Sequence, residues 1–293
     1  MTNIRVISRL DIKGPNLVKG IHLEGLRVMG KPEQYAKYYY ETGADELMYM
    51  DVVASLYGRN SLKDLITRTA KEIFIPLTVG GGIRTIEDIR EVLRAGADKV
   101  SINTAAVKNP QMIKDASRIF GSSTIVVAIE AIRQPDGTYM AYTDNGREET
   151  GLEVLSWAKK VEELGAGEIV LTSVDREGSG KGYDLDLLKM VVNEVSIPVV
   201  AHGGPSKPEH IKRAIVEGGA SAVAIASLLH YSYIQSHDLA GDFRGEGNLE
   251  FIKSGKNFSV FEKANIADIK KYLYKAGISC RHLAKKEQFK KQV

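Results

Sequence analysis

Apolar, often β-branched runs recur along the chain and alternate with segments of helical period. Eight runs have strand length and are mostly apolar rather than strictly alternating, as in a parallel sheet covered by helices. Segments between them, such as KPEQYAKYYYETG and TIEDIREVLRAG, mostly end in glycine, a common helix terminator. The alternation predicts an α/β fold, a (β/α)8 TIM barrel. The predicted strands are IRVISRLDI (4–12), DELMYMDVV (45–53), IPLTVGG (75–81), DKVSIN (98–103), TIVVAIEA (124–131), GEIVLTSVD (167–175), IPVVAHGG (197–204) and SAVAIAS (221–227).

The second half of the chain repeats the first. EIFIPLTVGGGIRT aligns with EVSIPVVAHGGPSK, GADKVSINTA with GASAVAIASL, and RLDI with AIEA. Such long-period similarity indicates a barrel built from two repeated half-barrels. The alignments pair Gly81 with Gly203, Gly82 with Gly204, Thr104 with Ser227, and Asp11 with Glu130.

This repeat also predicts the domain organisation. We expect one domain over residues 1–293, with half-barrels at about 1–121 and 122–245. An extra loop, 231–264, follows the eighth strand, and a C-terminal helix is expected at about 266–276. Another helix is expected to begin at a capping box formed by Thr150 and Glu153.

Composition narrows the class of protein. The chain has 293 residues, 43% hydrophobic and 26% charged, with a net charge of +3. A single cysteine, Cys280, excludes an intramolecular disulfide. The N-terminus lacks a signal-peptide core, and no apolar run approaches the roughly 18 residues of a membrane helix. We therefore expect a soluble cytoplasmic protein that binds neither nucleic acid nor membrane.

The repeated residues fall where barrel enzymes carry their chemistry, at the C-terminal ends of the strands. Paired glycines let backbone N–H groups approach a ligand, and a hydroxyl residue opening a helix favours an anion. Two such sites suit a substrate with a phosphate at each end. Tight turns repeated by descent are the alternative. The expected phosphate-binding residues are Gly81, Gly82, Thr104, Gly203, Gly204 and Ser227.

Two carboxylates occupy equivalent strand ends in the two halves. Asp11 and Glu130 could act as general acid and base on a substrate held between them. Salt bridges of Asp11 or Glu130 with Lys13 or Lys19 are the structural alternative. The histidines form no cluster with metal-ligand spacing, so we expect neither a metal nor another cofactor.

The chain resembles the cyclase subunit family of imidazole glycerol phosphate synthase, HisF. The motifs that carry the resemblance include LDIKGPNLVKG, PLTVGGGI, GADKVSINTAAV, FGSSTIVVAIEA and GAGEIVLTSVDREGSGKGYD. The resemblance implies a substrate that is an aminoimidazole carboxamide ribonucleotide with a phosphoribulosyl-formimino arm. Ammonia from a HisH-like glutaminase attacks that arm. Cyclisation and cleavage then give imidazole glycerol phosphate and an aminoimidazole carboxamide ribotide.

Site residues follow from the same resemblance. It implies that Asp11 is one of the acid and base residues and that Lys19 is the lysine of a mobile loop after strand one. Asn103 joins Gly82 and Thr104 at one phosphate site. At the N-terminal face, where the glutaminase docks, the resemblance implies a ring of charges that guards ammonia entry. The ring is Arg5, Glu46, Lys99 and Glu168.

Three positions depart from the family pattern. Glu130 replaces an aspartate, which moves its carboxylate by about 1.5 Å, and misplacement by about 1 Å can cost on the order of a hundredfold in rate. Arg9 replaces a cysteine, and His202 replaces a small residue before the strand-seven glycines. Both substitutions add bulk or charge at the barrel mouth.

These departures leave two roles open. One is the cyclase of histidine biosynthesis. The other is that of a related protein linked to surface-polysaccharide genes, which passes ammonia to a nucleotide-sugar amidotransferase that makes an acetamidino sugar of lipopolysaccharide. Glu130 and the inserted segment 231–264 suit the second role, whereas the ring of charges suits both roles equally. A non-enzymatic scaffold is the third and weakest alternative.

Overall fold

The computed structural model describes residues 3–54, 62–237 and 261–281. Its eight central strands are parallel and close on themselves, because β10 pairs with β7 as well as with β11. This confirms the predicted (β/α)8 barrel, and each predicted strand overlaps an observed one. The barrel strands are β1 (Arg5–Lys13), β4 (Glu46–Asp51), β5 (Leu77–Gly80), β6 (Lys99–Ile102), β7 (Ile125–Arg133), β10 (Glu168–Ser173), β11 (Val199–His202) and β12 (Ala222–Ile225).

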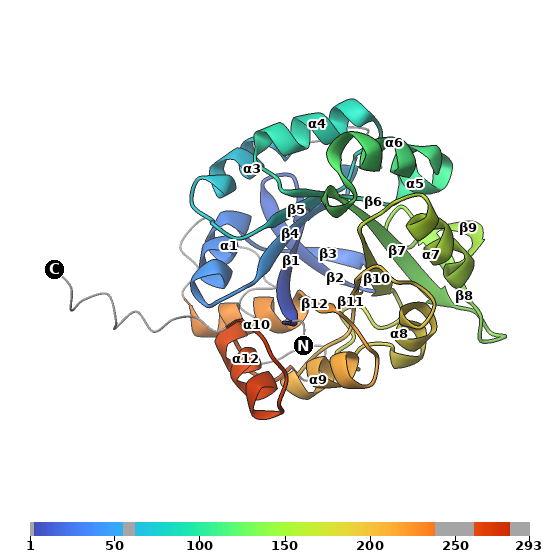
Figure 1. Ribbon diagram of the computed structural model, residues 1–293. Helices are drawn as coiled ribbons and strands as arrows, with labels where there is room; N and C mark the ends of the chain where they lie inside the picture. The colour runs from blue at the N-terminus through green and yellow to red at the C-terminus, as the bar shows by residue number, and fades with distance from the viewer. Residues whose placement is uncertain (1–2, 55–61, 238–260, 282–293) are drawn as a thin grey trace.

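Helices surround the barrel in the described part of the chain (Figure 1). Their apolar faces and the outer faces of the strands form one large core of buried side chains. The helices are α1 (Pro32–Glu41), α3 (Lys63–Ala70), α4 (Ile86–Ala95), α5 (Thr104–Lys108), α6 (Gln111–Phe120), the 3-10 turn η1 (Ser122–Thr124), α7 (Val154–Glu163), α8 (Leu185–Val192), α9 (Pro208–Val216), α10 (Ser227–Ser236) and α12 (Ile266–Lys275). None of the described helices is both long and apolar enough to cross a membrane.

Two antiparallel additions were not predicted. β2 (Asn16–Ile21) and β3 (Glu24–Gly30) extend β1, whereas β8 (Tyr139–Thr143) and β9 (Glu148–Glu153) extend β7. The expected capping box is wrong, because Thr150 belongs to β9, where its hydroxyl bonds to the Ala141 carbonyl oxygen at 2.7 Å. Helix α7 begins after Glu153 without a side-chain cap.

The segment after the eighth barrel strand begins as a helix. Residues 231–236, expected to be a loop, belong to α10. Residues 238–260 of the expected insertion lie outside the described residues. The C-terminal helix is α12, which begins at a capping box of Asn265 and Asp268 and contacts α9.

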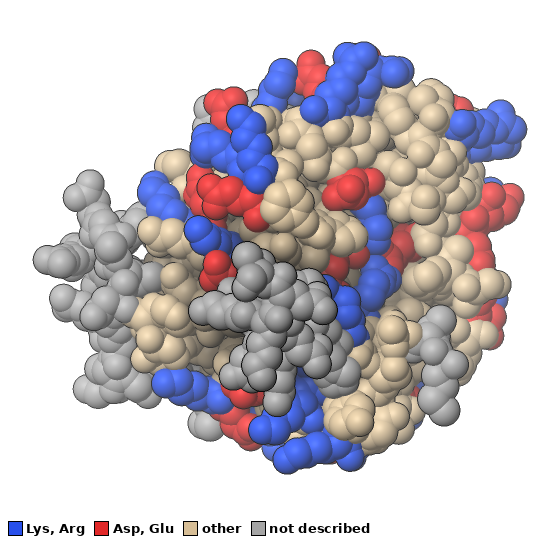
Figure 2. Space-filling model, turned by 60° about the vertical axis from the view of Figure 1, so that its left-hand side comes forward, with Lys and Arg blue, Asp and Glu red and all other residues tan. Residues whose placement is uncertain are grey.

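The barrel interior is layered. Residues of β1 with period two face inward: Arg5 at the bottom, then Ile7, then Arg9 and Asp11. Ile7 belongs to a buried apolar layer inside the barrel, which separates the two charged ends. The other members of the layer are Met48, Val126, Val170, Val200, Ala222 and Ala224. On the outer surface seen in Figure 2, basic and acidic side chains are interspersed.

Candidate active site

Asp11 lies inside the upper part of the barrel between two cations. Its Oδ1 accepts from Arg9 Nε at 2.8 Å, and its Oδ2 is 3.6 Å from Lys19 Nζ. Burial alone would raise the pKa of Asp11, but the charges of Arg9 and Lys19 outweigh it and lower the pKa below its usual range. Asp11 is therefore ionised at neutral pH.

Glu130 has the opposite electrostatic environment. It is buried, and this burial raises its pKa to about 7, against the opposing effects of a bond from Gly146 and the charge of Arg9. The Gly146 N–H donates to Glu130 Oε2 at 2.8 Å. A carboxyl group with this pKa can supply a proton near neutral pH, which an ordinary exposed glutamate cannot.

The first expected phosphate site forms a cleft of about 380 Å³. Gly81, Gly82, Asn103 and Thr104 all line it, together with Glu130. The backbone of Gly81 has φ +94°, and a Cβ there would lie 2.2 Å from the Asp51 carbonyl oxygen. Only glycine fits this turn. Thr104 begins α5, which has five residues, so the expected contribution of a helix dipole is small.

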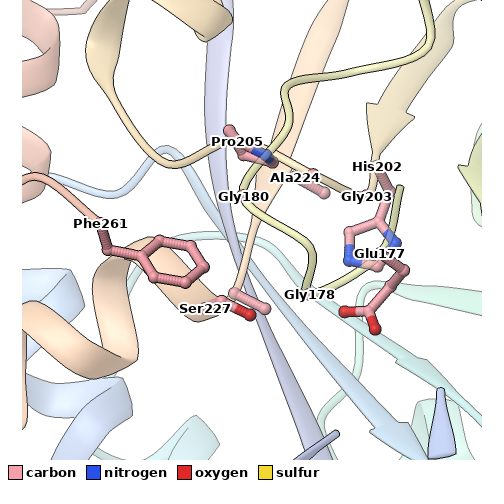
Figure 3. A pocket seen from close by; sticks show the side chains of 11 residues that line it. Glu177, Gly178, Gly180, His202, Gly203, Pro205, Ala224, Ser227 and Phe261 are labelled. Carbon is pink, nitrogen blue, oxygen red and sulfur yellow. The ribbon is translucent and has the colours of Figure 1, made fainter. Parts of the chain in front are cut away.

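The second expected phosphate site is nearly closed. Gly203, Gly204 and Ser227 line a pocket of about 10 Å³, which holds about one water molecule. A phosphate enters only if lining residues move. Phe261, which follows the undescribed part of the insertion, lies at the edge of this pocket (Figure 3). The Ser227 hydroxyl is buried, and it has no hydrogen-bond partner among the described residues.

Lys19 differs from the expectation. It belongs to strand β2 rather than to a loop, and its side chain is buried. It forms an ion pair with Glu177 and approaches Asp11, so the salt-bridge alternative for Asp11 holds in this structure. Glu177 also accepts from the Leu23 N–H at 3.2 Å, which ties the β2–β3 addition to the connection after β10.

The four residues of the expected ring meet at the opposite end of the barrel. Arg5 bonds to Glu46 at 2.9 Å and also to Glu168, while Lys99 contacts the same two carboxylates at 3.0 and 3.1 Å. Thr78 donates to the remaining oxygen of Glu46 at 2.5 Å. Two cations and two anions thus form a closed, charge-balanced ring below the apolar layer.

Sequence reasoning missed the contacts that link the site. Arg9 and His202 were named only as departures from the family pattern. Glu177 and Thr172 occurred only within a family motif and were given no role. The structure brings Arg9 Nη1 on β1 to 3.2 Å from His202 Nδ1 on β11, although β12 lies between these two strands. Glu177 follows a strand end, a position that could have drawn attention to it. No group of three or more His, Cys, Asp and Glu side chains suited to a metal occurs in the described part of the chain.

Comparisons with known proteins agree with this geometry. A family model described as "Histidine biosynthesis protein" matches residues 5–235. The imidazole glycerol phosphate synthase subunit HisF of Legionella pneumophila is 60% identical over 209 residues, 71% of this chain and 99% of that protein. The HisF subunit of Methanocaldococcus jannaschii is 50% identical over 250 residues, 79% of this chain and 92% of that protein. The chain therefore belongs to the histidine biosynthesis protein family and, within it, to the HisF family.

Proposed function

We propose that this chain is the cyclase subunit of imidazole glycerol phosphate synthase. It uses ammonia to convert the bis-phosphorylated formimino-ribulosyl ribonucleotide into imidazole glycerol phosphate and an aminoimidazole carboxamide ribotide. One observation carries the proposal: two buried carboxyl groups, Asp11 beside two cations and Glu130 in a cleft with no ion-paired cation among the described residues, lie in a barrel mouth with two glycine-lined pockets. A cytoplasmic location suits this role.

The roles of the two carboxyl groups follow from their environments. Asp11 is held ionised, so it is the general base that removes a proton from the nitrogen that ammonia brings in. Glu130 is half protonated near neutral pH, so it is the general acid that protonates the nitrogen leaving as the ribotide amine. The cleft beside Glu130 binds one phosphate, and the pocket at Ser227 binds the other.

The barrel interior supports ammonia delivery from below. An apolar layer lies directly above the charged ring of Arg5, Glu46, Lys99 and Glu168. An ammonium ion is strongly disfavoured in this layer, whereas neutral ammonia is not. The ring holds two buried carboxylates, whose burial is costly, so we expect the ring to have a function. We assign it to admitting ammonia from a glutaminase subunit.

Exposed apolar side chains favour the N-terminal face as the docking face of that glutaminase. Phe74 is 78% exposed and precedes β5, and Val216 is 62% exposed at the end of α9, which leads into β12. Ile119 near the end of α6 and Tyr274 near the end of α12 are also exposed. Connections that lead into barrel strands lie at the N-terminal face, where the charged ring is.

Phe74→Asp is expected to weaken docking. The glutaminase concentration that gives half-maximal glutamine-dependent turnover should rise about tenfold or more, because a charge replaces an exposed apolar contact. Turnover with ammonium salt should stay within about twofold and serves as the internal control. Equal loss of both activities would contradict the assignment of Phe74 to the docking face.

The deciding experiment is turnover of the formimino-ribulosyl substrate by the purified chain with excess ammonium salt at mildly alkaline pH. Free ammonia removes the need for a partner. Formation of imidazole glycerol phosphate is the expected result. Absence of product from a folded, phosphate-binding protein would overturn the proposal. The ammonia-conduit role would then account for the charged ring. The relatives named above are synthase subunits, and this similarity does not favour the conduit role.

A further inference from the structure

One ring nitrogen of His202 contacts side chains from two other barrel strands. It is the last residue of β11, and its side chain is buried. Its Nδ1 lies 3.2 Å from Arg9 Nη1 and 3.1 Å from the Thr172 hydroxyl. A side chain held from two strands in this way has one orientation.

The Arg9 contact fixes the tautomer of His202. A guanidinium has donors only, so Nδ1 must accept, and the ring proton is on Nε2. Burial, together with the positive charge of Arg9, lowers the pKa of His202 well below its usual value, so the ring is neutral. His202 is therefore a neutral donor with its N–H at Nε2.

That donor belongs to the second pocket. His202 lines it beside Gly203 and Ser227, and Figure 3 shows the imidazole at the pocket edge above Glu177. None of the hydrogen bonds among the described residues involves His202 Nε2. Of the eleven lining residues, none is Lys or Arg, and Glu177 is ion-paired with Lys19. The side chains left to donate to a ligand are those of His202 and Ser227.

We propose that His202 is a ligand-binding residue that donates its Nε2–H to a phosphate oxygen of the ligand in the second pocket. Arg9 is its positioning residue, because it sets the tautomer through Nδ1. The inference rests on the proposed function, which supplies the phosphorylated ligand. Two neutral donors and the backbone N–H groups of Gly203 and Gly204 then bind a phosphate where no cation lines the pocket.

A pair of variants separates the two ring nitrogens. Asn at position 202 keeps an acceptor near Nδ1 for Arg9 but ends short of the pocket, whereas Gln carries a donor to about the reach of Nε2. The probe is inorganic phosphate, titrated calorimetrically in a Thr104→Val background that disables the first site. His202→Asn should weaken binding roughly tenfold or more, and His202→Gln should restore it to within about threefold.

Turnover gives a second readout. With ammonium salt, His202→Asn should raise KM by a similar factor and leave kcat within about twofold, since a phosphate remote from the reacting atoms contributes equally to ground and transition states. Unchanged phosphate affinity in His202→Asn, or equal weakening in both variants with a lowered melting temperature, would overturn the proposal. Phosphate binding that depends on His202 in a protein without turnover would uphold it and refute the cyclase role alone.

Nitrogen-15 NMR of the imidazole tests the positioning role of Arg9. The His202 signals, assigned by their loss in His202→Asn, should report the Nε2–H tautomer in the wild-type protein at pH 7. In Arg9→Met the signals should shift towards a mixture of tautomers. An Nδ1–H ring or an imidazolium in the wild-type protein would refute the assignment.

Discussion

Asp11→Asn is expected to lower kcat for ammonium-dependent formation of imidazole glycerol phosphate by about 10² to 10⁴-fold, the usual contribution of a general base. An amide cannot accept the proton that the attacking nitrogen gives up. The loss should appear equally in kcat and in kcat/KM, because the base acts only in the transition state. Steady-state kinetics at saturating ammonia measure both.

The same substitution disturbs the charges around Asp11. Arg9 and Lys19 are buried, and Asp11 is the carboxylate that contacts both. Removing one partner of a buried ion pair typically costs about 3–5 kcal/mol, although Glu177 still pairs with Lys19. Urea unfolding must therefore accompany the kinetics, so that a lost rate is assigned to folded protein.

Asp136→Asn is a matched control, because it replaces the same carboxylate with the same amide on the exposed β7–β8 connection. It should leave kcat unchanged. Near wild-type activity in folded Asp11→Asn would assign the base to another group and would turn Asp11 into a structural partner of Arg9 and Lys19.

The sequence was sufficient to predict the barrel and the glycine turns that line the candidate site. Glycine clusters such as Gly81 and Gly203 recur because the same turn is needed in each half, and repetition is visible in a single sequence. Both take positive φ values at the ends of β5 and β11. The charged ring could be proposed because a family resemblance supplied it.

The features of the site and fold that the sequence did not predict depend on contacts between residues far apart in the chain. Arg9 and His202 are 193 positions apart, and Lys19 and Glu177 are 158 apart, so no local pattern links them. The β8–β9 addition was missed because β9 is half-exposed and lacks the apolar run of a barrel strand. Its Thr150 and Glu153 match a capping box by spacing, but the β8 pairing prevailed over that local preference.

Glu130→Gln is expected to lower kcat/KM by about 10² to 10⁴-fold at pH 6.5 and to abolish an ionisation near pH 7. In the wild-type protein the general acid must be protonated. Since its pKa is about 7, kcat/KM should be level below that pH and fall about tenfold per unit above it. The free ammonia concentration must be held constant across the series, because ammonium itself ionises.

The ionisation of Glu130 should also appear in the stability of the protein. Here Glu130→Gln is expected to be favourable at high pH, whereas it lowers the activity. The pKa of Glu130 is raised from 4.5 in the unfolded chain to about 7 in the folded one, so the folded state binds the proton more tightly. Its contribution to the free energy of unfolding is present below pH 4.5 and is lost as pH rises through 7. Relative to wild type, Glu130→Gln should gain on the order of 3 kcal/mol between pH 4 and pH 8.

Glu148→Gln provides the matched control, because Glu148 is exposed on β9 and should show neither effect. The pH dependence of stability reports whether Glu130 is buried, and the pH dependence of kcat/KM reports whether it takes part in catalysis. A pH-dependent stability difference without the kinetic ionisation would mean that Glu130 is buried and neutral but transfers no proton. A rate that rises rather than falls through pH 7 would make Glu130 the base and Asp11 an electrostatic partner, since only the ionised form of a base is active.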